Sequence, residues 1–111
     1  MQTTDRRAAT AAYKERKVRA GIYAIRCPAT GQAWVGEAPN LGGIANRIWF
    51  SLRHGGHRNR AMQAAFQAHG ADGLGLEVLE TLAEEEDAYL RGRQLSERRA
   101  YWQAHLGADR A

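Results

Sequence analysis

The sequence predicts a small α/β domain, of the α+β kind, in which helices flank a three-stranded mixed or antiparallel sheet and an additional helix precedes it. The chain has 111 residues, which is enough for one hydrophobic core. Two short β-branched and aromatic segments are separated by a turn sequence, and several later segments repeat their apolar residues at helical spacing. With 44% hydrophobic and 25% charged residues, the composition is typical of a folded globular domain.

The first part of the chain predicts a helix followed by a hairpin. Thr4 is a suitable cap for a helix over residues 5–18. Residues 20–27 and 32–36 predict two strands, and the turn sequence between them predicts that they pair. With that turn, Tyr23 faces Gly36 and Ile25 faces Trp34. Tyr23 and Trp34 therefore share one face of the hairpin.

The second part of the chain predicts three helices and one strand. Apolar residues recur at spacings of three and four from residue 41 to about 54, and Asn59 caps a further helix that stops at Gly70. Residues 74–80 alternate like a half-buried strand, and residues 84–105 return to a helical pattern with an acidic first turn. The predicted order is helix, strand, strand, helix, helix, strand, helix.

Three segments divide the chain. Residues 1–19 are a basic N-terminal helix, residues 20–106 form the folded domain, and residues 107–111 are a C-terminal tail. No stretch approaches the length of a membrane span, and the N-terminus lacks the apolar core of a secretory signal, so we expect a cytoplasmic protein without membrane contact. Cys27 is the single cysteine, which excludes an internal disulfide and a multi-cysteine zinc site.

The net charge of +4 is unevenly distributed. Residues 1–26 carry seven Lys or Arg against two acids, and residues 47–60 carry four arginines, two histidines and no acid. Residues 61–90 contain seven acids and no Lys or Arg. A basic face attracts the phosphate backbone of nucleic acid without reading its sequence. A solvated helix face has the same composition, so charge alone does not separate the two interpretations.

Two tripeptides on the predicted hairpin form a paired motif. The first strand contains the tripeptide Gly21-Ile22-Tyr23. The second strand contains the tripeptide Trp34-Val35-Gly36, which begins thirteen residues after Gly21. A helix with Arg47, the segment His57-Arg58-Asn59, the strand around residues 76–80 and a helix with Glu97 and Tyr101-Trp102 follow in that order. Over about residues 20–106 this pattern resembles the GIY-YIG nucleases.

The resemblance implies a site and a cofactor. In such a family the strand tyrosines line the site, an arginine on the following helix holds phosphate, and a glutamate on a later helix binds one divalent metal. These roles fall on Tyr23, Arg47 and Glu97, with Mg²⁺ or Mn²⁺ as the metal. Gly36 is expected to leave space for a phosphodiester beside the Tyr23 ring. The further candidates for substrate contacts are Trp34, Gly36, Arg53, His54 and Asn59.

The match departs from the family pattern at the metal site. The family's glutamate stands three residues before the aromatic that is Trp102 here, and that position is Arg99. Glu97 serves as the metal ligand only if the helix is rotated slightly. We therefore carry two hypotheses forward. The first is a metal-dependent endonuclease acting on nucleic acid, with DNA as the expected substrate. The alternative is a catalytically impaired nucleic-acid-binding module of the same fold.

Overall fold

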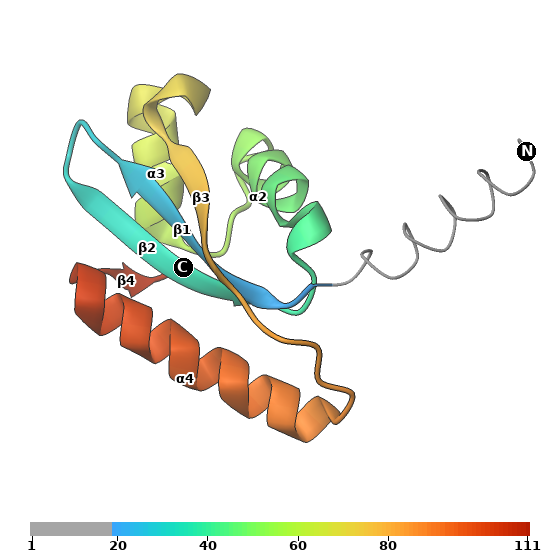
Figure 1. The fold of residues 1–111 in the computed structure, drawn as a ribbon. Helices are drawn as coiled ribbons and strands as arrows, with labels where there is room; N and C mark the ends of the chain where they lie inside the picture. The colour runs from blue at the N-terminus through green and yellow to red at the C-terminus, as the bar shows by residue number, and fades with distance from the viewer. Residues whose placement is uncertain (1–18) are drawn as a thin grey trace, which may run out of the picture.

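The computed structural model describes residues 19–111, so the helix predicted over residues 5–18 lies outside the described part (Figure 1). Within that part, the predicted order of strands and helices is confirmed. The elements are β1 (Gly21–Cys27), β2 (Gln32–Ala38), the 3₁₀ turn η1 (Leu41–Gly43), α2 (Ile44–Arg53), α3 (Arg60–His69), the 3₁₀ turn η2 (Ala71–Gly73), β3 (Gly75–Thr81), α4 (Ala88–Leu106) and β4 (Asp109–Arg110).

The sheet has four strands in the order β3-β1-β2-β4, not the three that we expected. β1 pairs antiparallel with both β2 and β3, and the pairing of Tyr23 with Gly36 and of Ile25 with Trp34 confirms the predicted register. The additional strand β4 comes from the expected tail. It runs parallel to β2, with Asp109 and Arg110 as its two residues.

The turn between β1 and β2 fixes this register. The backbone N–H groups of Thr30 and Gly31 both donate to the Cys27 carbonyl, at 3.2 and 2.9 Å. Gly31 has a φ of 76°, a left-handed conformation that favours glycine. Because a shift of one residue would move every side chain to the opposite face, this turn decides which residues of the hairpin enter which core.

Helices cover both faces of the sheet (Figure 1). On one face, α2 and α3 bury Leu52 and Met62 against Trp34, whose exposed fraction is 1%. On the other face, α4 buries Leu95 against the alternate residues of β1 and β2, such as Val35. The site residues that alternate with Val35 therefore lie on the α2 and α3 side.

Helix α4 begins later than the sequence predicted. Asp87 is its N-cap, because the Asp87 side chain accepts hydrogen bonds from the backbone N–H groups of Tyr89 and Leu90. The acidic residues 84–86 precede the cap, so the expected acidic first turn is wrong. A composition that suits the first turn of a helix does not distinguish that turn from the loop before it.

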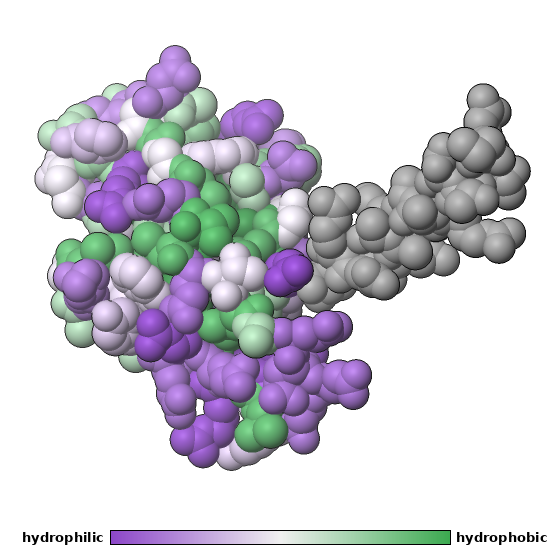
Figure 2. Space-filling view, viewed as in Figure 1, coloured by the Kyte–Doolittle hydropathy of each residue, from purple (hydrophilic) through white to green (hydrophobic). Residues whose placement is uncertain are grey.

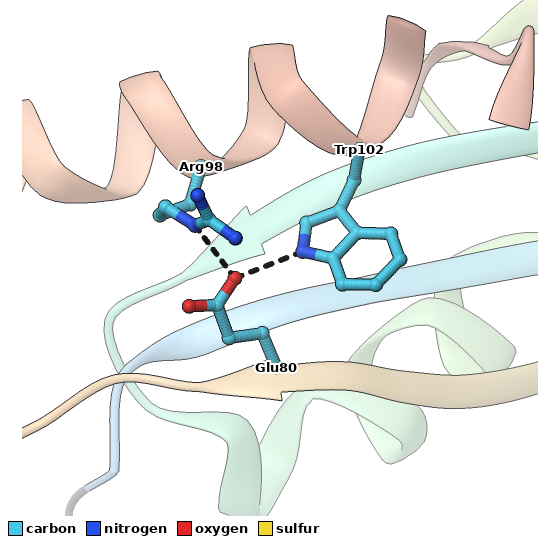
Figure 3. A network of polar contacts seen from close by, with 3 residues as sticks. All are labelled: Glu80, Arg98 and Trp102. Atoms are coloured by element: carbon cyan, nitrogen blue, oxygen red, sulfur yellow. Dashed lines mark hydrogen bonds and ion pairs between the residues drawn. The ribbon is translucent and has the colours of Figure 1, made fainter. Parts of the chain in front are cut away.

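A polar network attaches α4 to the sheet (Figure 3). The Glu80 carboxylate on β3 accepts hydrogen bonds from Arg98 Nε at 2.7 Å and from Trp102 Nε1 at 2.9 Å. Both donors lie on α4, one helical turn apart. Arg98 is therefore occupied in positioning the helix.

Figure 2 shows hydrophilic residues over α4 and a band of hydrophobic residues across the middle of the same face, at the level of the sheet. The edge strand β3 carries an exposed apolar side chain, Val78, which is 49% exposed. Between residues 19 and 111, no helix is both long and apolar enough to cross a membrane.

Candidate active site

A shallow pocket of about 300 Å³ brings together residues from β1, α2 and the segment after α2. Arg47 and Ser51 lie four residues apart on α2 and therefore share a helix face. Gly55, with a φ of 74°, lets the chain reverse after α2 and return toward that face. The pocket is lined by Tyr23, Ile44, Arg47, Ile48, Ser51, Gly56, His57 and Arg58.

Tyr23 occupies the space beside Gly36. A Cβ atom built on Gly36 would overlap the ring and the hydroxyl group of Tyr23. The Tyr23 ring therefore fills the space at Gly36 that we expected a phosphodiester to enter, and Gly36 itself is buried. Gly36 makes room for the tyrosine and not for substrate, which corrects its predicted role.

The Tyr23 hydroxyl is held in its protonated form. Burial raises the pKa of Tyr23 above its ordinary value of 10.0, and the nearby Arg47 and Arg58 only partly oppose this effect. Glu37 adds to the rise. The two guanidinium groups are thus close to the hydroxyl, but the direction of the shift favours a hydrogen-bond donor over the expected general base.

His57 supplies a neutral imidazole to the same pocket. Burial, and then the charge of Arg58, lower its pKa below the ordinary value of 6.5. Its Nδ1 lies 2.7 Å from Ser51 Oγ, which is also 3.0 Å from the Ile48 carbonyl. A carbonyl only accepts, so the single hydroxyl hydrogen of Ser51 goes to Ile48 and His57 Nδ1 donates. This pairing leaves His57 Nε2 as a free acceptor.

The backbone of His57 is also anchored. Its N–H donates to Gln63 Oε1 at 3.0 Å, and Gln63 Nε2 donates to the Leu52 carbonyl at 3.0 Å. Neither His57 nor Arg58 was among the site residues that the sequence predicted, although both belong to the family pattern. The available signal was their place after Gly55-Gly56, where a chain reversal returns them to α2.

Two of the expected substrate contacts are structural residues. Trp34 lies in the core, where it does not reach the surface. Asn59 caps α3, because its Oδ1 accepts from the Met62 N–H at 3.0 Å while its Nδ2 donates to the Arg110 carbonyl at 2.9 Å. Its capping role was predicted and is confirmed, and each of its two amide atoms holds one bond within the protein.

The other two expected contacts remain accessible on α2. Arg53 is exposed and lies outside the pocket. His54 is also exposed, its Nδ1 lies 2.9 Å from the Phe50 carbonyl, and its ring stacks on the Phe50 ring. Neither lines the pocket with Arg47.

The expected metal ligand is not brought to this pocket. Glu97 lines a separate pocket between α4 and β2, where its side chain is 64% exposed and pairs with Arg93 at 3.0 Å. Glu37 lines that pocket too, and it forms an ion pair with Arg99. Arg99, the residue at which the family resemblance led us to expect the glutamate, thus pairs with the Glu37 carboxylate.

These residues do not fit a bound divalent metal as they are arranged. Mg²⁺ and Mn²⁺ prefer carboxylate, carbonyl and water oxygens, but each of the two carboxylates already holds a guanidinium group. Nowhere in residues 19–111 do three or more His, Cys, Asp or Glu side chains gather to form a metal site.

Comparison with family models gives no match, and comparison with curated proteins gives none either. Two solved structures are similar. A mutant of the catalytic domain of intron endonuclease I-TevI is 25% identical, with a TM-score of 0.67, over 80% of this chain and 84% of that one. The catalytic domain of homing endonuclease I-TevI is also 25% identical, with a TM-score of 0.67, over 79% and 88%. The chain has a GIY-YIG nuclease-like fold.

Proposed function

We propose that this protein is an endonuclease that hydrolyses phosphodiester bonds in nucleic acid, with DNA as the substrate. The observation that carries the proposal is the pocket on the α2 side of the sheet. It combines a neutral imidazole, a tyrosine hydroxyl and two guanidinium groups, contributed by His57, Tyr23, Arg47 and Arg58. The similarity to the catalytic domain of an endonuclease supports the same conclusion.

The proposed reaction uses each group of the pocket. Arg47 and Arg58 hold the phosphate and stabilise the negative charge that develops on it. The Tyr23 hydroxyl donates a hydrogen bond to a phosphate oxygen. A water oxygen forms a bond to phosphorus while His57 Nε2 takes the proton from that water. The bond from phosphorus to the sugar oxygen breaks, and that oxygen takes a proton from solvent.

The pocket continues along the surface toward α3. A second depression of about 610 Å³ shares Gly56, His57 and Arg58 with it and extends to Arg60 and Gln67. Guanidinium and amide groups along such a track suit the phosphates on either side of the one being cut. This continuity supports a polymer as the substrate.

The Mg²⁺ or Mn²⁺ requirement implied by the family resemblance remains a prediction. When bound in such a site, a divalent metal neutralises charge on the phosphate and the leaving oxygen. Glu97 and Glu37, the two carboxylates that line the pocket between α4 and β2, would have to hold it, but both are paired with arginines. The proposed reaction therefore uses no metal. Glu97→Gln tests this part separately, because it removes one charge from a highly exposed side chain.

A nucleic-acid-binding module without catalysis is the second candidate. The ion pair of Arg99 and Glu37 favours it, because it places a cation where the family has a metal-binding glutamate. In that case the pocket would still hold phosphate.

A cleavage assay separates the two candidates. Labelled single-stranded and double-stranded DNA, and RNA, are incubated with the full chain in EDTA, Mg²⁺ or Mn²⁺, and binding is measured on the same substrates. We expect cleavage by the unmodified protein and its loss in His57→Gln, while binding persists. His69→Gln, an exposed histidine at the end of α3, is the matched control. Binding without cleavage under every condition would establish the binding module instead.

A further inference from the structure

Helix α2 carries an aromatic pair that the core does not use. The buried side of α2 is formed by Ile48 and Leu52. Phe50 points away from them and is 62% exposed. Its ring lies against that of His54, with centroids 4.1 Å apart and an angle of 28° between the planes. The stack presents a flat aromatic surface to solvent.

Arginines flank this aromatic pair on both sides. At 3.6 residues per turn, Phe50 lies about 60° around the helix from Arg47 and about 60° from Arg53 in the other direction. Arg47 also lines the pocket proposed to hold the phosphate. The sequence contains no acidic residue between Glu37 and Asp72. The exposed ring therefore lies within a basic surface, next to the phosphate pocket.

A flat ring between guanidinium groups suits one kind of ligand. Nucleobases stack on aromatic side chains, and the phosphates attached to them bind neighbouring cations. An apolar protein segment would gain the contact with the ring but would leave the guanidinium groups beside it without partners.

Resting on the proposed function, we infer that Phe50 and His54 form a stacking platform for an unpaired nucleobase, adjacent to the phosphate held by Arg47. A base inside a duplex is already stacked on both sides, so it cannot use the platform without leaving the helix. The preferred ligand of this surface is therefore single-stranded nucleic acid, or a nucleotide displaced from a duplex.

Binding measurements on Phe50→Ala test the inference. Fluorescence anisotropy is recorded with a labelled single strand, with a duplex containing the same sequence, and with an abasic strand that has phosphates but no bases. We expect Phe50→Ala to bind the single strand roughly 5- to 150-fold more weakly, the range for one base–aromatic stack. Its affinity for the duplex and the abasic strand should be unchanged. Phe50→Trp, which keeps an aromatic face, should bind the single strand like the unmodified protein.

Two control variants give the test its specificity. Tyr89→Ala removes an aromatic side chain that is 70% exposed on α4, away from the pocket, and should not affect binding. Arg47→Ala should weaken binding to all three ligands, because each carries phosphates.

The outcomes distinguish failure of the platform from failure of the proposed function. If Arg47→Ala weakens binding but Phe50→Ala binds the single strand normally, or loses all three ligands equally, the platform is wrong and the phosphate pocket stands. If Phe50→Ala loses only the single strand while Arg47→Ala binds normally, the platform stands and the pocket is wrong. Absence of binding by the unmodified protein would overturn both.

Discussion

Tyr23 lies on β1, and its side chain lines the pocket. Its ring fills the place that Gly36 leaves without a side chain, and its hydroxyl lies near the guanidinium groups of Arg47 and Arg58. Because burial raises the pKa of that hydroxyl despite the two cations, the hydroxyl keeps its proton at neutral pH and is available to donate a hydrogen bond to the phosphate in the proposed reaction. In the proposed reaction, His57 accepts the proton, because its lowered pKa keeps the imidazole neutral.

The pH dependence of cleavage should identify the base. With His57 as base, the rate should be constant above neutral pH and fall only below about 6.5, because the lowered pKa keeps the imidazole neutral down to that range. His57→Gln should reduce the rate roughly 100- to 10,000-fold, the usual contribution of a general base. A rate that keeps rising toward pH 10 in the unmodified protein would assign the base role to Tyr23 instead.

Arg99 pairs with Glu37, one of the two carboxylates that line the other pocket. Replacing it by glutamate would set a second carboxylate beside Glu37, and two adjacent carboxylates are a better ligand set for a hard divalent cation. We expect Arg99→Glu to bind Mn²⁺ about tenfold more tightly than the unmodified protein, a gain of about 1.4 kcal/mol. Titration calorimetry measures this directly.

The matched control for that measurement is Arg93→Glu, which adds the same charge beside the more exposed Glu97. It should change Mn²⁺ affinity less. Tight binding of Mn²⁺ by the unmodified protein, lost in Glu97→Gln, would show that the ion pairs open for the metal and that the ligand set expected from the family resemblance is correct.

At the scale of elements, the sequence predicted the features that depend on neighbouring residues, namely the turn of the hairpin and the helices with regularly spaced apolar residues. The turn at Gly31 fixes the hairpin register, so the shared face of Tyr23 and Trp34 followed from the sequence. The spacing of apolar residues likewise revealed α2 and α3. Strand β4 was missed because two residues carry no periodic pattern. The start of α4 was misplaced because the Asp87 cap lies within a run of acids that are all compatible with a helix start.

The sequence predicted only those residues of the candidate site whose positions follow from the hairpin turn and the spacing of apolar residues. Tyr23 and Arg47 share a pocket because the hairpin and the α2 periodicity place them on one side of the sheet. Trp34 entered the core because the helices cover its face completely. The position of the Glu97 side chain depends on the rotation of α4 about its axis relative to the sheet. The hydrogen bonds from Arg98 and Trp102 to Glu80 fix that rotation. No pattern within α4 contains that information.

The Glu80 network should make the stability of the protein sensitive to acid. Burial acts to raise the pKa of Glu80, but hydrogen bonds from Trp102 and Arg98 outweigh it, and the pKa lies below its ordinary value of 4.5. The charged form therefore adds stability above pH 4.5, and this stability is lost as the pH falls through the lowered pKa. Urea unfolding at a series of pH values measures the effect.

Glu80→Gln should lower the free energy of unfolding at pH 7 by about 1–3 kcal/mol, the range for hydrogen bonds to a charged group. Its unfolding free energy should also fall less steeply below pH 4.5 than that of the unmodified protein. Glu97→Gln, which removes an exposed carboxylate, serves as the control and should change little. An equal acid dependence in Glu80→Gln and the unmodified protein would show that other carboxylates are responsible.

At the scale of the whole molecule, the acidic residues of the described part are unevenly distributed. The acid-free stretch from residue 38 to residue 71 contains α2, α3 and the pocket. The acidic run at residues 84–87 lies before α4, which covers the opposite face of the sheet. If the proposed function is correct, we expect the acid-free stretch to attract a polyanion toward the pocket before any specific contact forms.

The salt dependence of binding should therefore come from the α2 and α3 side. We expect the logarithm of the binding constant for nucleic acid to fall linearly with the logarithm of the salt concentration, because bound cations are released from each phosphate that the protein neutralises. Arg58→Gln should reduce the slope by about one unit, the effect of losing one phosphate contact. Arg93→Gln removes the same charge from an exposed ion pair on α4 and should leave the slope unchanged. Equal slopes for Arg58→Gln and the unmodified protein, with a smaller slope for Arg93→Gln, would place the nucleic acid on the opposite face of the sheet and contradict the proposed site.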